Sequence, residues 1–162
     1  HQHDFGKWSV TGYEPEVYSV PISARLRAEL KRIVEDEKDF VRTICHGVNF
    51  DKDELPDEMQ RLTANVYLTP ASSGSAVVAD DKMVEMIKAQ QRKGSIFEME
   101  SFALYEAARL HPSEPLFFSA KAVVDDGGPT KGDRFHRLAC ILSAKTVFEC
   151  IRRLSENGGV RT

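Results

Sequence analysis

Residues 95–110 read SIFEMESFALYEAARL, and this stretch contains the passage from strand to helix that we expect to organise the fold. Ser95-Ile96-Phe97 is typical of a short strand, and the apolar residues further along recur at helical spacing. Glu98, Met99 and Glu100 lie between the two elements. Ligands of α/β sheets bind beyond the carboxyl ends of the strands, so this junction is the first candidate site.

A second apolar run lies downstream of this junction. Residues 116–124 read LFFSAKAVV, which is typical of a buried parallel strand, and Asp125 follows directly.

The rest of the chain predicts further helices and strands. Residues 1–21, rich in Gly, Pro and aromatic residues, predict irregular chain or an edge strand. The other predicted elements are a helical region from Ser23 to about Phe40, helices from Asp80 or Asp81 to about Arg92, over 101–110 and over about 133–154, and a short strand over 65–69. In the last helix, the residues expected to face inward are Leu138, Ile141, Leu142, Ala144, Val147, Phe148 and Ile151.

This alternation of strands and helices determines the expected fold class. Strands separated by helices predict a mostly parallel sheet with helices on its faces, which is an α/β fold. A chain of 162 residues suits a single domain, residues 1–162, that is large enough to bury a core.

Composition and charge exclude several classes of protein. A formal net charge of -3 argues against general affinity for nucleic acid or for acidic membranes. No apolar run approaches the ~20 residues that span a bilayer, and the polar N-terminus is not a signal peptide. Cys45, Cys140 and Cys150 form no CxxC pair, so we expect that these thiols are reduced and that the protein is cytoplasmic.

The acidic residues at the strand ends have two interpretations each. Glu98 and Glu100 could simply complement the positive end of a helix dipole, or a carboxylate there could accept hydrogen bonds from two sugar hydroxyls. Asp125 and Asp126 could form a turn with the glycines that follow. If one of them is buried, its pKa rises, and it can hold the proton that a general acid needs.

The histidines give little support to a metal site. His1 and His3 are close in the sequence, but no other spacing of ligands supports them, so we expect no metal and no cofactor.

Residues 97–105, FEMESFALY, followed by residues 118–125, FSAKAVVD, resemble the second half of the nucleoside phosphorylase and nucleosidase superfamily. That superfamily includes purine nucleoside phosphorylases, uridine phosphorylases and methylthioadenosine/S-adenosylhomocysteine nucleosidases. Residues 73–78, SGSAVV, resemble its base-binding loop. The resemblance covers about residues 65–154, and residues 1–64 agree loosely. It implies a three-layer α/β/α fold with a mixed, mostly parallel central sheet.

The resemblance also implies roles for individual residues. Met99 would pack against the ribose, and Glu100 would bind its hydroxyls, with Glu98 in a supporting role. Val77 falls where many members stack an aromatic ring on the base, and Val78 falls where backbone groups read the base edge. Asp125 falls at the general acid that protonates, or hydrogen-bonds, purine N7.

The implied reaction is cleavage of the N-glycosidic bond of a purine nucleoside or nucleotide, with release of the free base. Water as acceptor would give a nucleosidase-like hydrolase, and phosphate would give a phosphorylase. A catalytically silent module that binds or senses nucleosides is the alternative from a different class. Family members form dimers, trimers or hexamers, so the resemblance implies a homo-oligomer. It also leads us to expect that the N-terminal strands, which supply the acceptor side, belong to a missing half or fused domain, and that this chain is inactive alone.

Overall fold

The structure is a computed structural model that describes residues 1–35, 37–55, 61–90, 96–124 and 133–156. The described chain forms two compact units. The first unit contains residues 1–22, 69–90 and 96–118, and the second contains residues 23–68 and 119–156 where these are described. The single domain over residues 1–162 stays a prediction.

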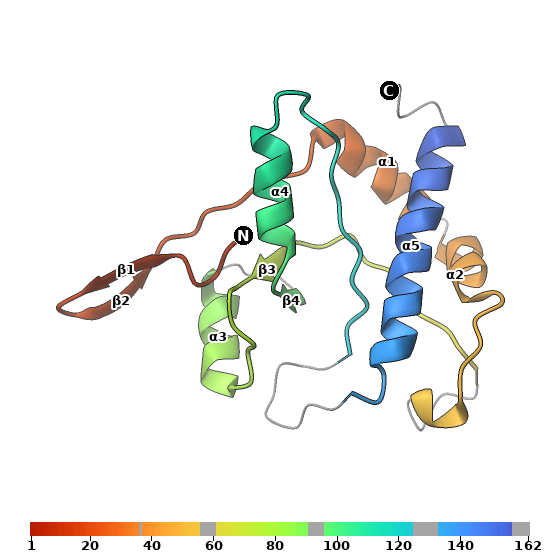
Figure 1. Cartoon of the computed structure of the whole chain (residues 1–162), viewed down its shortest axis with the longest axis horizontal. Helices are drawn as coiled ribbons and strands as arrows, with labels where there is room; N and C mark the ends of the chain where they lie inside the picture. Colours follow the sequence, from red (N-terminus) through yellow and green to blue (C-terminus); the bar gives the residue numbers. More distant parts are fainter. Residues whose placement is uncertain (36, 56–60, 91–95, 125–132, 157–162) are drawn as a thin grey trace. The chain divides into compact units, whose positions relative to one another are not determined.

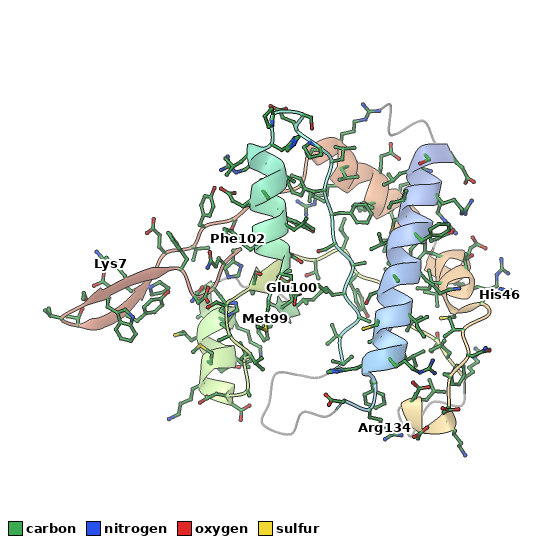
Figure 2. The ribbon with its side chains drawn as sticks, viewed as in Figure 1. Lys7, His46, Met99, Glu100, Phe102 and Arg134 are labelled. Atoms are coloured by element: carbon green, nitrogen blue, oxygen red, sulfur yellow. The ribbon has the colours of Figure 1, made fainter. Side chains whose placement is uncertain are left out.

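The first unit begins with a hairpin of two antiparallel strands, β1 (Gly6–Ser9) and β2 (Gly12–Pro15), shown in red in Figure 1. Gly12 has a φ of 123°, a conformation that a residue with a Cβ atom rarely adopts. Lys7, which Figure 2 labels on this hairpin, pairs with Glu14 across the two strands at 3.2 Å. The predicted irregular chain or edge strand over residues 1–21 is therefore in part a hairpin.

A second small sheet in the first unit is parallel. It pairs β3 (Ala71–Ser73) with β4 (Ile96–Glu98), with Ser73 opposite Glu98. The chain's first residues flank β3 on its other side: Ser73 N–H donates to the carbonyl of His1 at 2.8 Å, and His3 N–H donates to the carbonyl of Ser73 at 2.9 Å. β3 is therefore held by backbone hydrogen bonds along both edges.

Two helices accompany this parallel sheet. α3 (Asp81–Gln90) begins where the Asp80 carboxylate accepts the N–H groups of Lys82 at 2.7 Å and Met83 at 3.3 Å, which confirms the predicted cap. The buried side chains of α3, Val84 and Ile87, form a small core with Val78 of the loop after β3, and Phe97 of β4 packs against it. α4 (Ser101–Leu110) follows β4 and has the predicted bounds.

The second unit is helical among its described residues. It contains α1 (Ala24–Glu35), α2 (Glu37–Cys45), the short 3-10 helix η1 (Lys52–Glu54) and α5 (His136–Glu156). α1, α2 and α5 contact one another. The predicted cap at Ser23 is confirmed, because its hydroxyl accepts the N–H of Leu26 at 3.2 Å. The buried apolar residues of these three helices are Leu26, Leu30, Ile33, Phe40, Ile44, Leu138, Cys150 and Leu154.

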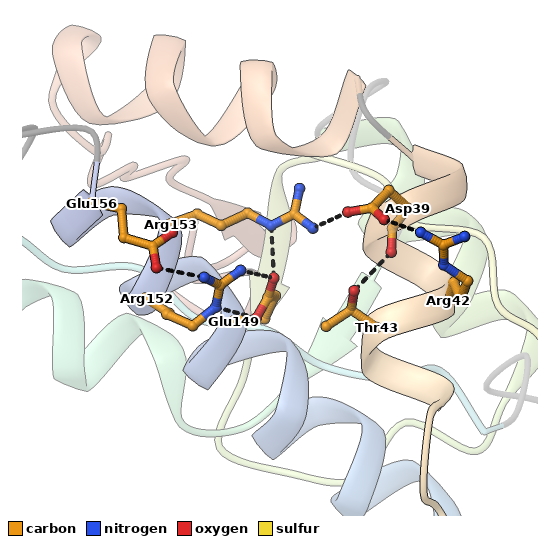
Figure 3. A network of polar contacts seen from close by, with 7 residues as sticks. All are labelled: Asp39, Arg42, Thr43, Glu149, Arg152, Arg153 and Glu156. Atoms are coloured by element: carbon orange, nitrogen blue, oxygen red, sulfur yellow. Dashed lines mark hydrogen bonds and ion pairs between the residues drawn. The ribbon is translucent and has the colours of Figure 1, made fainter.

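A buried carboxylate in α5, that of Glu149, binds two arginines of the same helix. The Glu149 side chain is 5% exposed and accepts hydrogen bonds from Arg152 at 2.7 and 2.8 Å and from Arg153 at 2.7 Å. Arg153 also donates to Asp39 of α2 at 2.8 Å (Figure 3). Its guanidinium lies 5.3 Å from the centre of the Phe40 ring. Hydrogen bonds from Arg152, and also from Arg153, lower the pKa of Glu149 to about 2, although burial acts in the opposite direction.

Three predictions about individual elements are wrong. Residues 65–69 and 116–124 form no strand in the described structure. An apolar run becomes a strand only beside a neighbour that satisfies its backbone, and here the N–H of Ala122 donates instead to the hydroxyl of Ser143 at 2.9 Å. In α5, Ala144, Phe148 and Ile151 are exposed, whereas Glu149 and Cys150 are buried.

The observed fold is mixed α/β, with one antiparallel and one parallel small sheet among the described residues. Within those residues, no helix combines the length and the apolar character needed to cross a membrane.

Candidate functional site

The parallel pairing of β3 and β4 places two predicted site segments at one sheet edge. Both strands end there, because Ser73 lies opposite Glu98. The contact continues one residue further, where the N–H of Gly74 donates to the carbonyl of Glu98 at 2.9 Å. The loop that leads to Val77 and Val78 and the junction that leads to Glu100 therefore start from adjacent points.

Glu98 lies at the centre of this edge and is half-buried. Its carboxylate accepts the backbone N–H groups of Glu100 at 2.9 Å and Ser101 at 2.7 Å, at the start of α4. Burial by itself raises the pKa of Glu98, but hydrogen bonds from Ser73, Glu100 and Ser101 outweigh it and hold the pKa below its usual value. Glu98 is therefore an anion that satisfies the N-terminus of a helix, which is the structural interpretation of this residue.

Two buried serines complete the surroundings of Glu98, and sequence reasoning did not identify their role. Ser73 and Ser101 are both buried, and both side chains help to lower the pKa of the Glu98 carboxylate. Ser73 Oγ also accepts the N–H of Phe102 at 3.3 Å. No local pattern in the sequence distinguishes Ser73 from its neighbour Ser72, because the role of Ser73 depends on its pairing with Glu98 in the parallel sheet.

Met99 and Glu100 are exposed beyond β4, as Figure 2 shows at the start of α4. The Met99 side chain is 45% exposed, and Glu100 occupies the N-cap position of α4 without a side-chain capping bond. An apolar side chain and a carboxylate that does not cap the helix are thus adjacent at the sheet edge. This pair can contact a ligand that combines an apolar face with hydroxyl groups.

The two valines of the loop after β3 have different environments. Val77 is 65% exposed, whereas Val78 is 9% exposed and packs with Val84, Ile87 and Phe97. Only Val77 therefore has a side chain available to a ligand, and the side chain of Val78 is part of the core. A contact between Val78 and a base would have to use backbone atoms, as the resemblance implies.

Asp125, to which the resemblance assigns proton donation, lies outside the described residues, as does its neighbour Asp126. The structure therefore places the consecutive residues Glu98, Met99 and Glu100 beside the end of β3, and the position of Asp125 stays a prediction.

A buried histidine, His3, packs against the start of the loop that follows β3. His3 is buried, its ring meets that of Phe97 edge to face at 6.5 Å, and its imidazole lies against the backbone of Gly74. Burial lowers the pKa of His3 below its usual value, although the Asp4 and Glu98 carboxylates act in the opposite direction. His3 is thus a neutral core histidine. In the described part of the chain, no group of three or more His, Cys, Asp or Glu residues could hold a metal ion.

Asp4 fixes the loop from the same side. Its carboxylate accepts hydrogen bonds from the backbone N–H of Ser75 at 2.7 Å and from the Ser75 hydroxyl at 2.5 Å. Burial raises the pKa of Asp4 and these bonds lower it, with the net shift downward. The first residues of the chain therefore determine the position of the loop that leads to Val77.

Replacing Gly74 by alanine is expected to destabilise the first unit by about 1–3 kcal/mol, the usual cost of overpacking. A Cβ atom at this position would lie 2.2 Å from Nε2 of His3, so the buried ring has to move. Urea unfolding of Gly74→Ala measures the effect. The double variant with His3→Ala removes the obstructing ring and should lose less stability than the two single changes combined. Wild-type stability of Gly74→Ala would contradict this packing.

Comparison of the chain with protein-family models, with curated proteins and with solved structures gave no match.

Proposed function

We propose that the chain is a nucleosidase-like hydrolase that cleaves the N-glycosidic bond of a purine nucleoside or nucleotide. The observation that supports this proposal best is the shared edge of β3 and β4, where Val77 and the Met99–Glu100 pair start from adjacent strand ends and are exposed. The resemblance assigns Val77 to contacts with the base, and Met99 and Glu100 to contacts with the sugar. The proposal also includes a three-layer α/β/α arrangement of the fold and assembly of the chain as a homo-oligomer.

The proposed roles follow from the charge that develops when the bond breaks. The sugar becomes positive, as in the oxocarbenium-like transition state of glycoside hydrolysis, and the departing base becomes negative. Glu100 would bind the sugar hydroxyls and hold the substrate in place. A protonated Asp125 near N7 would neutralise the base, and such general acid catalysis contributes ~10²–10⁴-fold.

A screen for base release tests this proposal. The protein in its natural full length is incubated with adenosine, methylthioadenosine, AMP and ATP, each with and without inorganic phosphate, and free adenine is measured by chromatography. We expect adenine from at least one substrate without phosphate. A strict requirement for phosphate would favour a phosphorylase. Saturable binding of these compounds without any release would favour a silent binding module.

A further inference from the structure

The buried hydroxyl of Ser73 connects a strand end to the helix that carries the proposed sugar-binding residue. Ser73 is the last residue of β3, and its backbone is bonded to residues 1–3 on one side and lies opposite Glu98 on the other. Its side chain is 4% exposed, so solvent contributes little to its hydrogen bonding. The position of this hydroxyl is therefore determined by the sheet.

The hydroxyl of Ser73 contacts the first turn of α4 and influences Glu98, the residue opposite it in the sheet. It accepts the N–H of Phe102, in the first turn of α4, at 3.3 Å. The Ser73 side chain also helps to lower the pKa of the neighbouring Glu98 carboxylate, which accepts the N–H groups of Glu100 at 2.9 Å and Ser101 at 2.7 Å. A hydroxyl has one donor and two acceptor lone pairs, so one serine can make both contacts at once.

These contacts hold three successive N–H groups, those of Glu100, Ser101 and Phe102. Such groups have no carbonyl partner within the helix at its N-terminus, and side chains that satisfy them fix the helix start. The backbone of Glu100 is among them, whereas its carboxylate is exposed and makes no capping bond. The direction in which Glu100 presents its carboxylate thus depends on Glu98 and Ser73.

We infer that Ser73 is a positioning residue that acts through Glu98 to orient Glu100 toward the sugar hydroxyls of a nucleoside. This inference rests on the proposed function for its ligand. It makes the supporting role of Glu98 specific, because the Glu98 carboxylate holds the backbone N–H of Glu100.

The test compares Ser73→Ala with Ser73→Thr, which keeps the hydroxyl, and with Ser72→Ala as a matched control. Ser72 is also buried in β3, but its hydroxyl contacts the imidazole of His1 at 3.4 Å. The first readout is amide hydrogen exchange at Ser101 and Phe102. Loss of a helix cap typically speeds local opening by about twofold to thirtyfold, and we expect this range in Ser73→Ala only.

The second readout is steady-state base release from adenosine by the full-length protein. We expect Ser73→Ala to raise KM by about threefold to tenfold with kcat within about twofold, because an interaction with the bound sugar is weakened. Ser73→Thr should restore much of the wild-type KM, and Ser72→Ala should leave it unchanged. Equal effects of Ser72→Ala and Ser73→Ala on KM would overturn the inference.

The two readouts separate this inference from the proposed function. If the wild-type protein releases no base from any nucleoside, the proposed function fails, and the exchange data still report whether Ser73 holds the start of α4. Wild-type exchange at Ser101 and Phe102 in Ser73→Ala would overturn the inference even in an active enzyme.

Discussion

Replacing Asp125 by asparagine is expected to lower the rate of base release by about 10²–10⁴-fold, which is the usual contribution of a general acid. The departing purine takes up negative charge, and asparagine can donate a hydrogen bond to N7 but cannot transfer a proton. The loss should appear in kcat, because the proton is needed in the transition state more than in the bound substrate. Steady-state kinetics on the best substrate of the screen measure it.

The neighbouring Asp126 provides the matched control for this prediction. Asp126→Asn changes the same charge one residue further along the chain and should keep kcat within about threefold of wild type. If Asp126→Asn loses activity and Asp125→Asn does not, the general acid is Asp126. If neither variant loses activity, proton donation by this pair is wrong.

Replacing Glu149 by alanine is expected to lower the free energy of unfolding by about 3 kcal/mol. The reason is that Arg153, a mostly buried side chain, keeps its partner Asp39 but loses Glu149, with which it makes a 2.7 Å hydrogen bond. An arginine left partly uncompensated in the core costs more than the pair itself contributes. Urea unfolding followed by circular dichroism of the helices measures the change.

Glu156 offers a control on the same helix. It pairs with Arg152 at 2.6 Å, but its side chain is 60% exposed, so Glu156→Ala should cost at most about 1 kcal/mol. Equal losses from Glu149→Ala and Glu156→Ala would contradict the importance of the buried pair.

The low pKa of Glu149 also predicts how stability depends on pH. Hydrogen bonds from Arg152 and Arg153 lower this pKa from 4.5 to about 2 in the folded chain. A carboxyl whose pKa is lowered by folding contributes stability above its unfolded pKa, and that contribution disappears as the pH falls toward the folded pKa. The stability gap between wild type and Glu149→Ala should therefore narrow between pH 4.5 and about pH 2.

Local patterns in the sequence predicted the starts of α1, α3 and α4 correctly, whereas the single helical region predicted from Ser23 to about Phe40 forms two helices, α1 and α2, of which α2 extends to Cys45. Ser23 and Asp80 cap the helices that follow them, and α4 has the expected bounds, because caps and helical periodicity depend on residues a few positions apart. α5 begins at His136 rather than at about 133. Such shifts at helix ends are small compared with the length of the element.

Features that depend on distant residues were not predictable in the same way. Residues 116–124 have strand composition, but strand formation needs a neighbour that the sequence does not identify. The hydrophobic pattern of α5 gave no reason to bury Glu149, because its partners include Arg153 and, beyond it, Asp39 in another helix. Ser73 likewise acquires its role only through the parallel register with Glu98. The resemblance assigns sugar contacts to Met99 and Glu100 from residue identity alone, and these contacts stay a prediction.

The central claim, that Glu100 binds the sugar of a nucleoside whose base is released, is tested most directly by comparing two substrates in two proteins. The value measured is the ratio of kcat/KM for adenosine to that for 2′,3′-dideoxyadenosine, in wild type and in Glu100→Ala. The intrinsic reactivity of each nucleoside is common to both proteins and cancels in the comparison. Glu85→Ala, which removes an exposed carboxylate of α3, serves as the control.

We predict that the ratio falls by about 10- to 100-fold in Glu100→Ala, since a hydrogen bond to a charged group contributes about 1.5–3 kcal/mol. Glu85→Ala should keep the wild-type ratio. An unchanged ratio in Glu100→Ala, with adenine released at the wild-type rate, would contradict the role of Glu100 and the site built on it.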